Sequence, residues 1–230
     1  MPEISITMPI YNEGKTILKT VDDLVIELQK NKIDYEIIIV NNGSKDNTDK
    51  YIKQLIKKNR RLKRVYVKIN QGYGWGIING LRTAKGKFIG YIDGDGQIRP
   101  EDVISCLNYL RKHPKVELCK GQRKEKHGTI QRKIVSHIFD IIFTSLFFKY
   151  IKDINAKPKV MKKETYELLN LKSKEWFIDS EILIKCIKNK VKIGSVEVKV
   201  LNRYEGKSNV KTRIIFDFII DIIKYRLGLI

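Results

Sequence analysis

The chain has 230 residues, about the length of one α/β domain with an appendage. Its composition, 42% hydrophobic and 31% charged with 15 Gly and 5 Pro, excludes disordered and fibrous proteins. The 46 Lys and Arg exceed the 26 Asp and Glu and give a net charge of +20, which favours a polyanionic partner such as nucleic acid, an anionic membrane face or a phosphorylated substrate. Three scattered cysteines without a C-x-x-C pair disfavour a disulfide framework or a zinc knuckle.

Short β-branched runs alternate with longer amphipathic segments from the start of the chain. The predicted elements, in order, are strand 4–10, helix 13–31, strand 35–40, helix 46–59, strand 64–69, helix 75–84, strand 87–92 and helix 100–112. The nearly continuous apolar run at 35–40 is typical of a central parallel strand. Pro100 suits the first turn of a helix, where its missing N–H costs nothing. This alternation predicts an α/β fold with a doubly wound, mostly parallel sheet.

A polar or glycine-rich loop follows each of the four predicted strands. The loops are Pro9-Ile10-Tyr11-Asn12-Glu13, Asn41-Asn42-Gly43-Ser44, Asn70-Gln71-Gly72-Tyr73-Gly74-Trp75-Gly76 and Asp93-Gly94-Asp95-Gly96-Gln97. In a doubly wound sheet such loops converge on one crevice at the carboxyl ends of the strands, which is where ligands bind. The third loop lacks the Gly-Lys-Ser/Thr of a Walker loop, and the first strand is not followed by a dinucleotide fingerprint, so NAD binding is disfavoured.

Asp93 and Asp95 stand two positions apart directly after an apolar strand. Two carboxylates that lie close together repel unless a cation sits between them, and Mg²⁺ or Mn²⁺ shared with substrate phosphates is the natural occupant. Gly94 and Gly96 would leave room for a diphosphate to approach the backbone. The alternative is a simple Asp/Gly turn.

The pattern changes after about residue 121. Residues 130–151 are almost wholly apolar, with their polar side chains at helical spacing on one side, and residues 211–230 repeat this pattern. Such a wide apolar face is buried against protein or lipid, and basic residues at its ends are typical of membrane-interface helices. Two interpretations stay open: helices in a membrane interface, or helices that close the core or form a dimer contact. We therefore expect a domain over residues 1–210 and a C-terminal amphipathic helix over residues 211–230.

No stretch reaches the roughly 18 uninterrupted apolar residues of a membrane-spanning helix, and the first residues lack the layout of a signal peptide. We expect a cytoplasmic protein that is peripheral on the inner face of an anionic membrane. A nucleic-acid partner is not expected, because aromatic residues are not interleaved with the basic ones and no helix-turn-helix or RNP motif occurs.

Taken together, the four loops resemble those of the family-2 inverting glycosyltransferases with the GT-A nucleotide-sugar fold. The segments P-I-Y-N-E, V-N-N-G-S-K-D-N-T, N-Q-G-Y-G-W-G and D-G-D-G-Q carry the resemblance, which covers about residues 4–210. Within the family the chain looks most like the dolichol- or polyprenyl-phosphate sugar transferases. This implies a transferase dependent on Mg²⁺ or Mn²⁺ that moves a sugar from a nucleotide diphosphate sugar to a polyprenyl phosphate at the membrane surface. The alternative is a transferase that acts on a saccharide or cell-surface glycan.

The resemblance also implies a donor site. The residues expected to bind the nucleotide sugar are Pro9, Tyr11, Glu13, Asn41, Asn42, Gly74, Asp93, Gly94, Gln97, Arg203 and Lys207, with Asp93 and Asp95 as metal ligands. Asn41 and Asn42 stand where the family usually has two aspartates. An amide offers one donor and one acceptor, which suits uracil, so UDP is favoured over GDP. Because Asn41 and Asn42 replace these aspartates, a further alternative is a membrane-bound scaffold protein that has lost catalytic activity.

On the acceptor side, Arg123 and Arg132 resemble the arginine pair that holds an acceptor phosphate, and arginine forks suit phosphate oxygens. Residues 153–158 stand where the family commonly has Asp-x-x-Ser-Gly-Phe, but Lys157 and Pro158 depart from that pattern.

Asp179 and Glu181 resemble an acidic pair that borders the acceptor. A sugar hydroxyl would need one of these residues, or Asp153, as a general base, whereas a prenyl phosphate is already an anion and needs only positioning. The expected catalytic residues are Asp95, Arg123, Arg132, Asp179 and Glu181.

Overall fold

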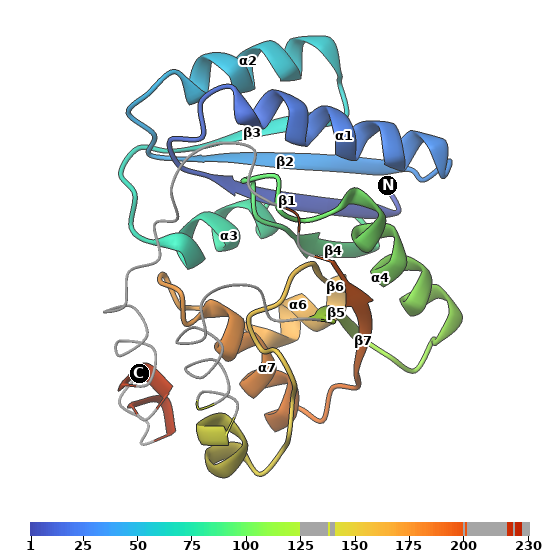
Figure 1. Ribbon diagram of the computed structural model, residues 1–230, viewed down its shortest axis with the longest axis vertical. Coiled ribbons are helices and arrows are strands. Elements are labelled where there is room, and N and C mark those ends of the chain that lie inside the picture. Colours follow the sequence, from blue (N-terminus) through green and yellow to red (C-terminus); the bar gives the residue numbers. More distant parts are fainter. Residues whose placement is uncertain (125–137, 139–140, 200, 202–219, 223, 227–230) are drawn as a thin grey trace.

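A computed structural model describes residues 1–124, 138, 141–199, 201, 220–222 and 224–226 (Figure 1). Its elements, in chain order, are β1 (Ile4–Ile10), α1 (Thr16–Lys30), β2 (Tyr35–Asn42), α2 (Thr48–Lys58), β3 (Leu62–Val67), α3 (Tyr73–Leu81), β4 (Phe88–Tyr91), α4 (Pro100–Lys112), β5 (Leu118–Arg123), β6 (Lys159–Lys162), α6 (Lys163–Leu169), α7 (Ile178–Lys188) and β7 (Ile193–Val198). Residues 141–147 are also helical.

The strands form one sheet in the order β3-β2-β1-β4-β6-β5-β7. β6 runs antiparallel to its neighbours β4 and β5, and the other pairings are parallel. The predicted α/β fold with a mostly parallel sheet is confirmed. Because β6 is reversed, its first residue, Lys159, pairs with Tyr91 at the end of β4. The start of β6 therefore lies at the same edge of the sheet as the ends of the parallel strands.

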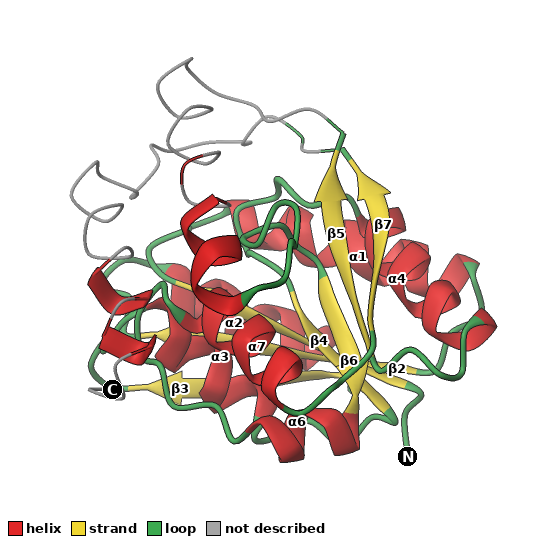
Figure 2. Ribbon diagram, turned by 90° about the horizontal axis from the view of Figure 1, so that it is seen from below, coloured by secondary structure: helices red, strands yellow, loops and turns green. Residues whose placement is uncertain are grey.

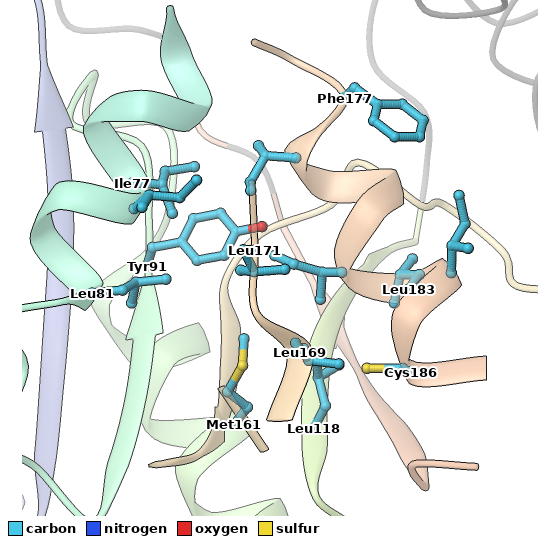
Figure 3. Packing of buried hydrophobic residues seen from close by; sticks show 14 of the residues in the cluster. Ile77, Leu81, Tyr91, Leu118, Met161, Leu169, Leu171, Phe177, Leu183 and Cys186 are labelled. Carbon is cyan, nitrogen blue, oxygen red and sulfur yellow. The ribbon is translucent and has the colours of Figure 1, made fainter. Parts of the chain in front are cut away.

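Helices cover both faces of the sheet (Figure 2). Along β2, Ile37 and Ile39 pack into one core with the buried sides of α1, α2 and α4, whereas Ile38 and Val40 pack into a second core with α3 and α7. Successive side chains of a strand point to opposite faces, so a fully apolar strand such as β2 needs both layers. In the second core the ring of Tyr91 extends from β4 between α3 and α7 (Figure 3).

The predicted elements before residue 113 all occur, with small shifts at their ends. The prediction for residues 64–69 is displaced, since β3 spans 62–67 and Ile69 lies in a loop with 67% of its surface exposed. Pairing in register with β2, which joins Leu62 to Ile37, sets those limits. The helix predicted from residue 75 begins at Tyr73.

The described parts of the two late apolar segments contribute to the second core. Phe143 and Ile222 are fully buried in it, and the ring of Tyr225 lies 5.6 Å from that of Phe177. The rest of 130–151 and of 211–230, together with the expected boundary after residue 210, lies outside the described residues. Among the residues that the structure describes, no helix is long and apolar enough to cross a bilayer.

Candidate active site

The loops that follow β1 and β2 are tied to each other by hydrogen bonds. The Asn12 N–H donates to Ser44 Oγ at 3.1 Å, and the Lys45 N–H donates to Asn12 Oδ1 at 2.8 Å. Asn12 adopts a left-handed conformation with φ 54°, which asparagine tolerates better than most residues. The first loop, which carries the half-buried Tyr11, is thus held against the second, as convergent strand ends require.

Asn41 is fully buried and both ends of its amide are engaged within the protein. Its Nδ2 donates to Asp49 Oδ1 at 2.8 Å, and its Oδ1 accepts the Ser44 N–H at 2.9 Å. Burial acts to raise the pKa of Asp49, but hydrogen bonds from Arg64 and Asn41 outweigh it and lower that pKa to about 2. These contacts make Asn41 an anchor between the loop and α2.

Asn42 differs from its neighbour because its amide is only half used. Its Nδ2 donates to the Gly72 carbonyl at 2.9 Å, but its buried Oδ1 has no hydrogen-bond partner in the described part of the chain. A buried acceptor without a partner costs free energy, so it suits a ligand that brings an N–H group. Of the two amides expected to meet the base, Asn42 therefore offers an open acceptor.

Two predicted donor-site glycines have a packing role. A side-chain carbon on Gly74 would overlap the Ser173 carbonyl and lie 2.7 Å from the Glu175 carbonyl. One on Gly94 would overlap the side chain of Ile10. The space on the side of Gly94 where a Cβ would project is thus filled by Ile10 of β1.

Asp93 and Asp95 follow β4 at the carboxyl edge of the sheet. Asp93 Oδ1 accepts the Tyr73 hydroxyl, its Oδ2 lies 3.9 Å from Lys157 Nζ, and its side chain is 30% exposed. Burial raises the pKa of Asp93, and the nearby charge of Asp95 raises it further, against the opposing charge of Lys157. Asp95 is thus close enough to Asp93 for its negative charge to act on that carboxyl group.

This pair fits a divalent ion by the chemistry of its donors. The described residues contain no cluster of three His, Cys, Asp or Glu side chains that could hold a metal alone. Mg²⁺ and Mn²⁺ are, however, often held by one or two carboxylates and complete their coordination with water and substrate phosphates. Asp93 and Asp95 would therefore bind such an ion together with a diphosphate.

The loop of the carboxylate pair is tied to a later segment through Gln97. The Gln97 N–H donates to Asp95 Oδ1 at 3.1 Å, and its side chain donates to the Leu201 carbonyl at 3.2 Å. The Leu201 N–H in turn donates to the Gln97 carbonyl at 2.9 Å. Residue 201 thus lies beside the carboxylates.

A buried ion network lies behind the carboxylate pair. Asp179, in the first turn of α7, accepts Lys157 Nζ at 2.8 Å and the Tyr91 hydroxyl at 2.6 Å, and it also accepts Lys159 Nζ. Burial acts to raise the pKa of Asp179, but the two ammonium groups outweigh it and bring that pKa below its usual range. Lys157 reaches both Asp179 and Asp93 and so joins the network to the carboxylate pair.

Sequence reasoning missed these lysines as functional groups. Lys157 drew notice only as a departure from the family pattern, and Lys159 lies in the short run KVMK, which was not predicted as a strand. Tyr73 was also missed, although it stacks on Trp176 with ring centroids 4.5 Å apart and donates to Asp93. The available signal was a lysine flanked by apolar residues, since a buried ammonium requires an anion.

On the acceptor side, Arg123 is fixed by the buried Asp153. The carboxylate accepts the backbone N–H of Arg123 at 2.9 Å and its Nε at 2.8 Å. Burial acts to raise the pKa of Asp153, but Arg123 outweighs it and lowers that pKa below its usual range. The arginine side chain remains 27% exposed.

Glu181 is buried and bonded to the segment before α7. It accepts the backbone N–H groups of Lys172 at 2.9 Å and Ser173 at 2.8 Å, and pairs with Lys185 at 2.6 Å. These contacts shape the 172–175 segment that packs on Gly74. Three other predicted site residues lie outside the described part of the chain: Arg132, Arg203 and Lys207.

Comparison with known proteins gives the family of the chain. Residues 5–171 match the family model described as glycosyl transferase family 2. The chain belongs to this family. It is 30% identical to an uncharacterized protein of Methanocaldococcus jannaschii, over 95% of this chain and 96% of the relative.

Two further relatives of this glycosyltransferase carry functional names. A dolichyl-phosphate beta-glucosyltransferase of Dictyostelium discoideum is 28% identical over 85% of this chain and 65% of its own length. Another, from Trichomonas vaginalis, is 26% identical over 98% and 75%. Among solved structures, the chain is similar to a glucosyl-3-phosphoglycerate synthase of Mycobacterium tuberculosis in complex with Mn²⁺, UDP and glucosyl-3-phosphoglycerate. The TM-score is 0.77 and the sequence identity is 18%, and the match covers 99% of this chain and 80% of the synthase chain. This likeness confirms the GT-A fold of the glycosyltransferase.

Proposed function

We propose that this glycosyltransferase moves a sugar, with inversion, from a nucleotide diphosphate sugar to a polyprenyl phosphate at a membrane surface, with Mg²⁺ or Mn²⁺ as cofactor. An acceptor phosphate oxygen would attack the anomeric carbon as the bond to the diphosphate breaks on the opposite face. Asp93 and Asp95 would hold the ion, whose contribution is to offset charge on the departing diphosphate. Asn42 would accept an N–H of the base. We favour UDP over GDP because the donor and the acceptor of an amide match the carbonyl and the N–H of uracil.

The observation that carries the choice of acceptor is the state of the three acidic residues offered as general bases. Asp153 is bonded to Arg123 and Asp179 to two lysines, and the pKa of each is lowered. Glu181 is buried and accepts two backbone N–H groups and Lys185. The lowered pKa makes Asp153 and Asp179 poor proton acceptors, and the oxygens of Glu181 are engaged by Lys172, Ser173 and Lys185. A phosphate needs no base, so this arrangement supports a phosphate acceptor over a sugar hydroxyl.

The names of the relatives from Dictyostelium and Trichomonas support the same acceptor class. Arg123 would orient the acceptor phosphate, since its guanidinium stands at the carboxyl end of β5 with its direction set by Asp153.

We further propose that the enzyme is peripheral on the cytoplasmic face of an anionic membrane. After the helix at 141–147, the side chains of Phe148 and Tyr150 are exposed, and Lys149 and Lys152 lie between and beside them. Exposed aromatic residues next to lysines are suited to the headgroup region of a bilayer.

Radiolabelled transfer tests the proposal directly. Purified protein is incubated with UDP-glucose or GDP-mannose, Mn²⁺, and either a short polyprenyl phosphate, the matching prenol or a soluble disaccharide. We expect label in the organic phase with the phosphate alone, and none after addition of EDTA. Transfer to the disaccharide but not to the phosphate would favour the saccharide-acceptor alternative.

A further inference from the structure

Lys157 is a buried cation aimed at the carboxylate pair. It precedes β6 and is only 8% exposed, with its ammonium 2.8 Å from Asp179 Oδ2 and 3.9 Å from Asp93 Oδ2. It also lies over the ring of Tyr73, 5.1 Å from the centroid. Because Tyr73 itself donates to Asp93, both oxygens of that carboxylate have a partner on the protein side.

The two lysines of the network occupy different places. Lys159 is fully buried, and its ammonium donates to Asp179 and to the Ala156 carbonyl at 3.1 Å. Asp179 thus holds both lysines, but Lys157 is the one that extends to Asp93. Removal of the charge of Lys157 would still leave Asp179 bonded to Lys159 and Tyr91.

A fixed positive charge beside a site that binds both a divalent cation and a diphosphate acts on the two ligands with opposite sign. It repels the cation and attracts the anion, and the low exposure of Lys157 limits screening by salt. A general loss of packing or stability would weaken the binding of both ligands. Changes of opposite sign in the affinities for the cation and the anion therefore identify an effect of charge.

We propose that Lys157 is a donor-binding residue: its buried ammonium attracts the nucleotide diphosphate and keeps Mg²⁺ or Mn²⁺ from binding tightly before the nucleotide is present, and Asp179 is the positioning residue that aims it. The inference rests on the proposed function, since it assumes a metal and a diphosphate at Asp93 and Asp95. It gives a role to the position where the chain departs from the family pattern.

Two binding measurements on Lys157→Met test this role without any turnover. Mn²⁺ is titrated into the metal-free protein and followed by electron paramagnetic resonance, and UDP is titrated with EDTA present and followed by calorimetry, both at low ionic strength. For one charge about 5 Å from a divalent ion or a diphosphate, Coulomb's law gives at least about a tenfold effect even at the dielectric constant of water. We therefore expect Mn²⁺ to bind at least about tenfold more tightly and UDP at least about tenfold more weakly than to wild type.

Lys174→Met is the matched control, because Lys174 is exposed, carries the same charge and contacts Gln71 rather than either aspartate. It should change neither affinity by more than about twofold. Lys157→Gln, which keeps a hydrogen-bond donor for Asp179, is measured in parallel so that a folding defect in one variant does not decide the outcome.

Affinities that stay unchanged in the Lys157 variants, or that move in the same direction, would overturn the role of Lys157 while leaving the proposed function intact. Wild-type protein that binds neither Mn²⁺ nor UDP, alone or together, would overturn the donor site itself and this inference with it.

Discussion

Arg123 donates to the buried carboxylate of Asp153 from its backbone N–H at 2.9 Å and from its side-chain Nε at 2.8 Å. One carboxylate therefore fixes both the end of β5 and the direction of the guanidinium. Asp153 has φ 58°, so its own backbone is held in the left-handed region. A loop residue with this many constraints places the arginine rigidly, as recognition of a phosphate requires.

We expect Arg123→Lys to weaken use of the acceptor phosphate selectively. Lysine keeps the charge but cannot engage Asp153 and a phosphate with two parallel N–H groups. The KM for polyprenyl phosphate should rise about tenfold, equivalent to ~1.4 kcal/mol. Steady-state kinetics and UDP calorimetry check this, and an equal loss of UDP affinity would contradict the acceptor assignment.

Asp95→Asn should reduce metal-dependent turnover by a factor on the order of 100 or more, because an amide is a weaker ligand for a hard cation and leaves the diphosphate charge less well offset. Turnover is measured across a Mn²⁺ titration. Glu101→Gln, on the nearby α4 with an exposed side chain, is the control with the same change in charge and should stay within about twofold of wild type.

Asp102 gives the protein a specific dependence of stability on pH. It is 5% exposed, its Oδ2 has no hydrogen-bond partner within the described residues, and burial raises its pKa from 3.8 to about 6. The folded state thus retains a proton that the unfolded chain releases, so the contribution of Asp102 to stability is full below about pH 4 and is lost as the pH rises through about 6.

Asp102→Asn, which keeps an acceptor for the Lys199 N–H, should remove this dependence. We expect the variant to exceed wild type by about 1–3 kcal/mol in the free energy of unfolding near pH 7.5, and to match it near pH 4. Urea unfolding at both pH values measures the difference. The same gap at the two values would show that the carboxyl does not titrate in this range.

Gly74→Ala should destabilise the protein by about 2–4 kcal/mol, because the new methyl group would meet backbone carbonyls of the 173–175 segment, which cannot rotate away. Gly14→Ala is the comparison: Gly14 has φ +51° but its nearest neighbour would be 3.7 Å away, so only backbone strain of about 1 kcal/mol is expected. Urea unfolding of the two variants separates steric overlap from strain, and equal costs would argue against the overlap.

Replacement of Phe148 and Tyr150 by serine should weaken binding to anionic vesicles. Phe148 is 86% exposed, and burial of such a side chain in a bilayer interface contributes about 1–3 kcal/mol. Co-sedimentation with phosphatidylglycerol vesicles should show at least a several-fold loss. Leu168→Ser, an exposed apolar residue of α6, serves as the control, and a similar loss in that variant would indicate non-specific adsorption.

Much of the fold could be predicted because, in the first half of the chain, the spacing of apolar residues within each segment indicates whether it is a strand or a helix and which of its side chains are buried. The predicted strand 4–10 and helix 100–112 coincide with β1 and α4, and the run at 35–40 is the core of the buried strand β2. The strand-end loops could be placed at one edge for the same reason, since parallel strands bring their carboxyl ends together.

The roles of the individual residues at that edge of the sheet could not be predicted from the sequence. Asn41 and Asn42 are equivalent in the sequence, but only the structure separates the amide bonded to Asp49 from the one with an open acceptor. The sequence suggests Asp179 as a general base, but nothing near it in the chain indicates that two distant lysines donate to it.

The sequence by itself determined the layered α/β architecture, the family and the pair of acids after β4, because each depends on residues adjacent or regularly spaced along the chain. The tertiary structure decided the surroundings of those acids. β6 runs opposite to its neighbours, so its first residues meet the ends of the parallel strands and bring Lys157 beside Asp93, 64 positions earlier in the chain. The periodicity of the sequence indicates which side chains are buried. It does not indicate which distant charge each side chain contacts, and the ion pairs at this edge of the sheet depend on those contacts.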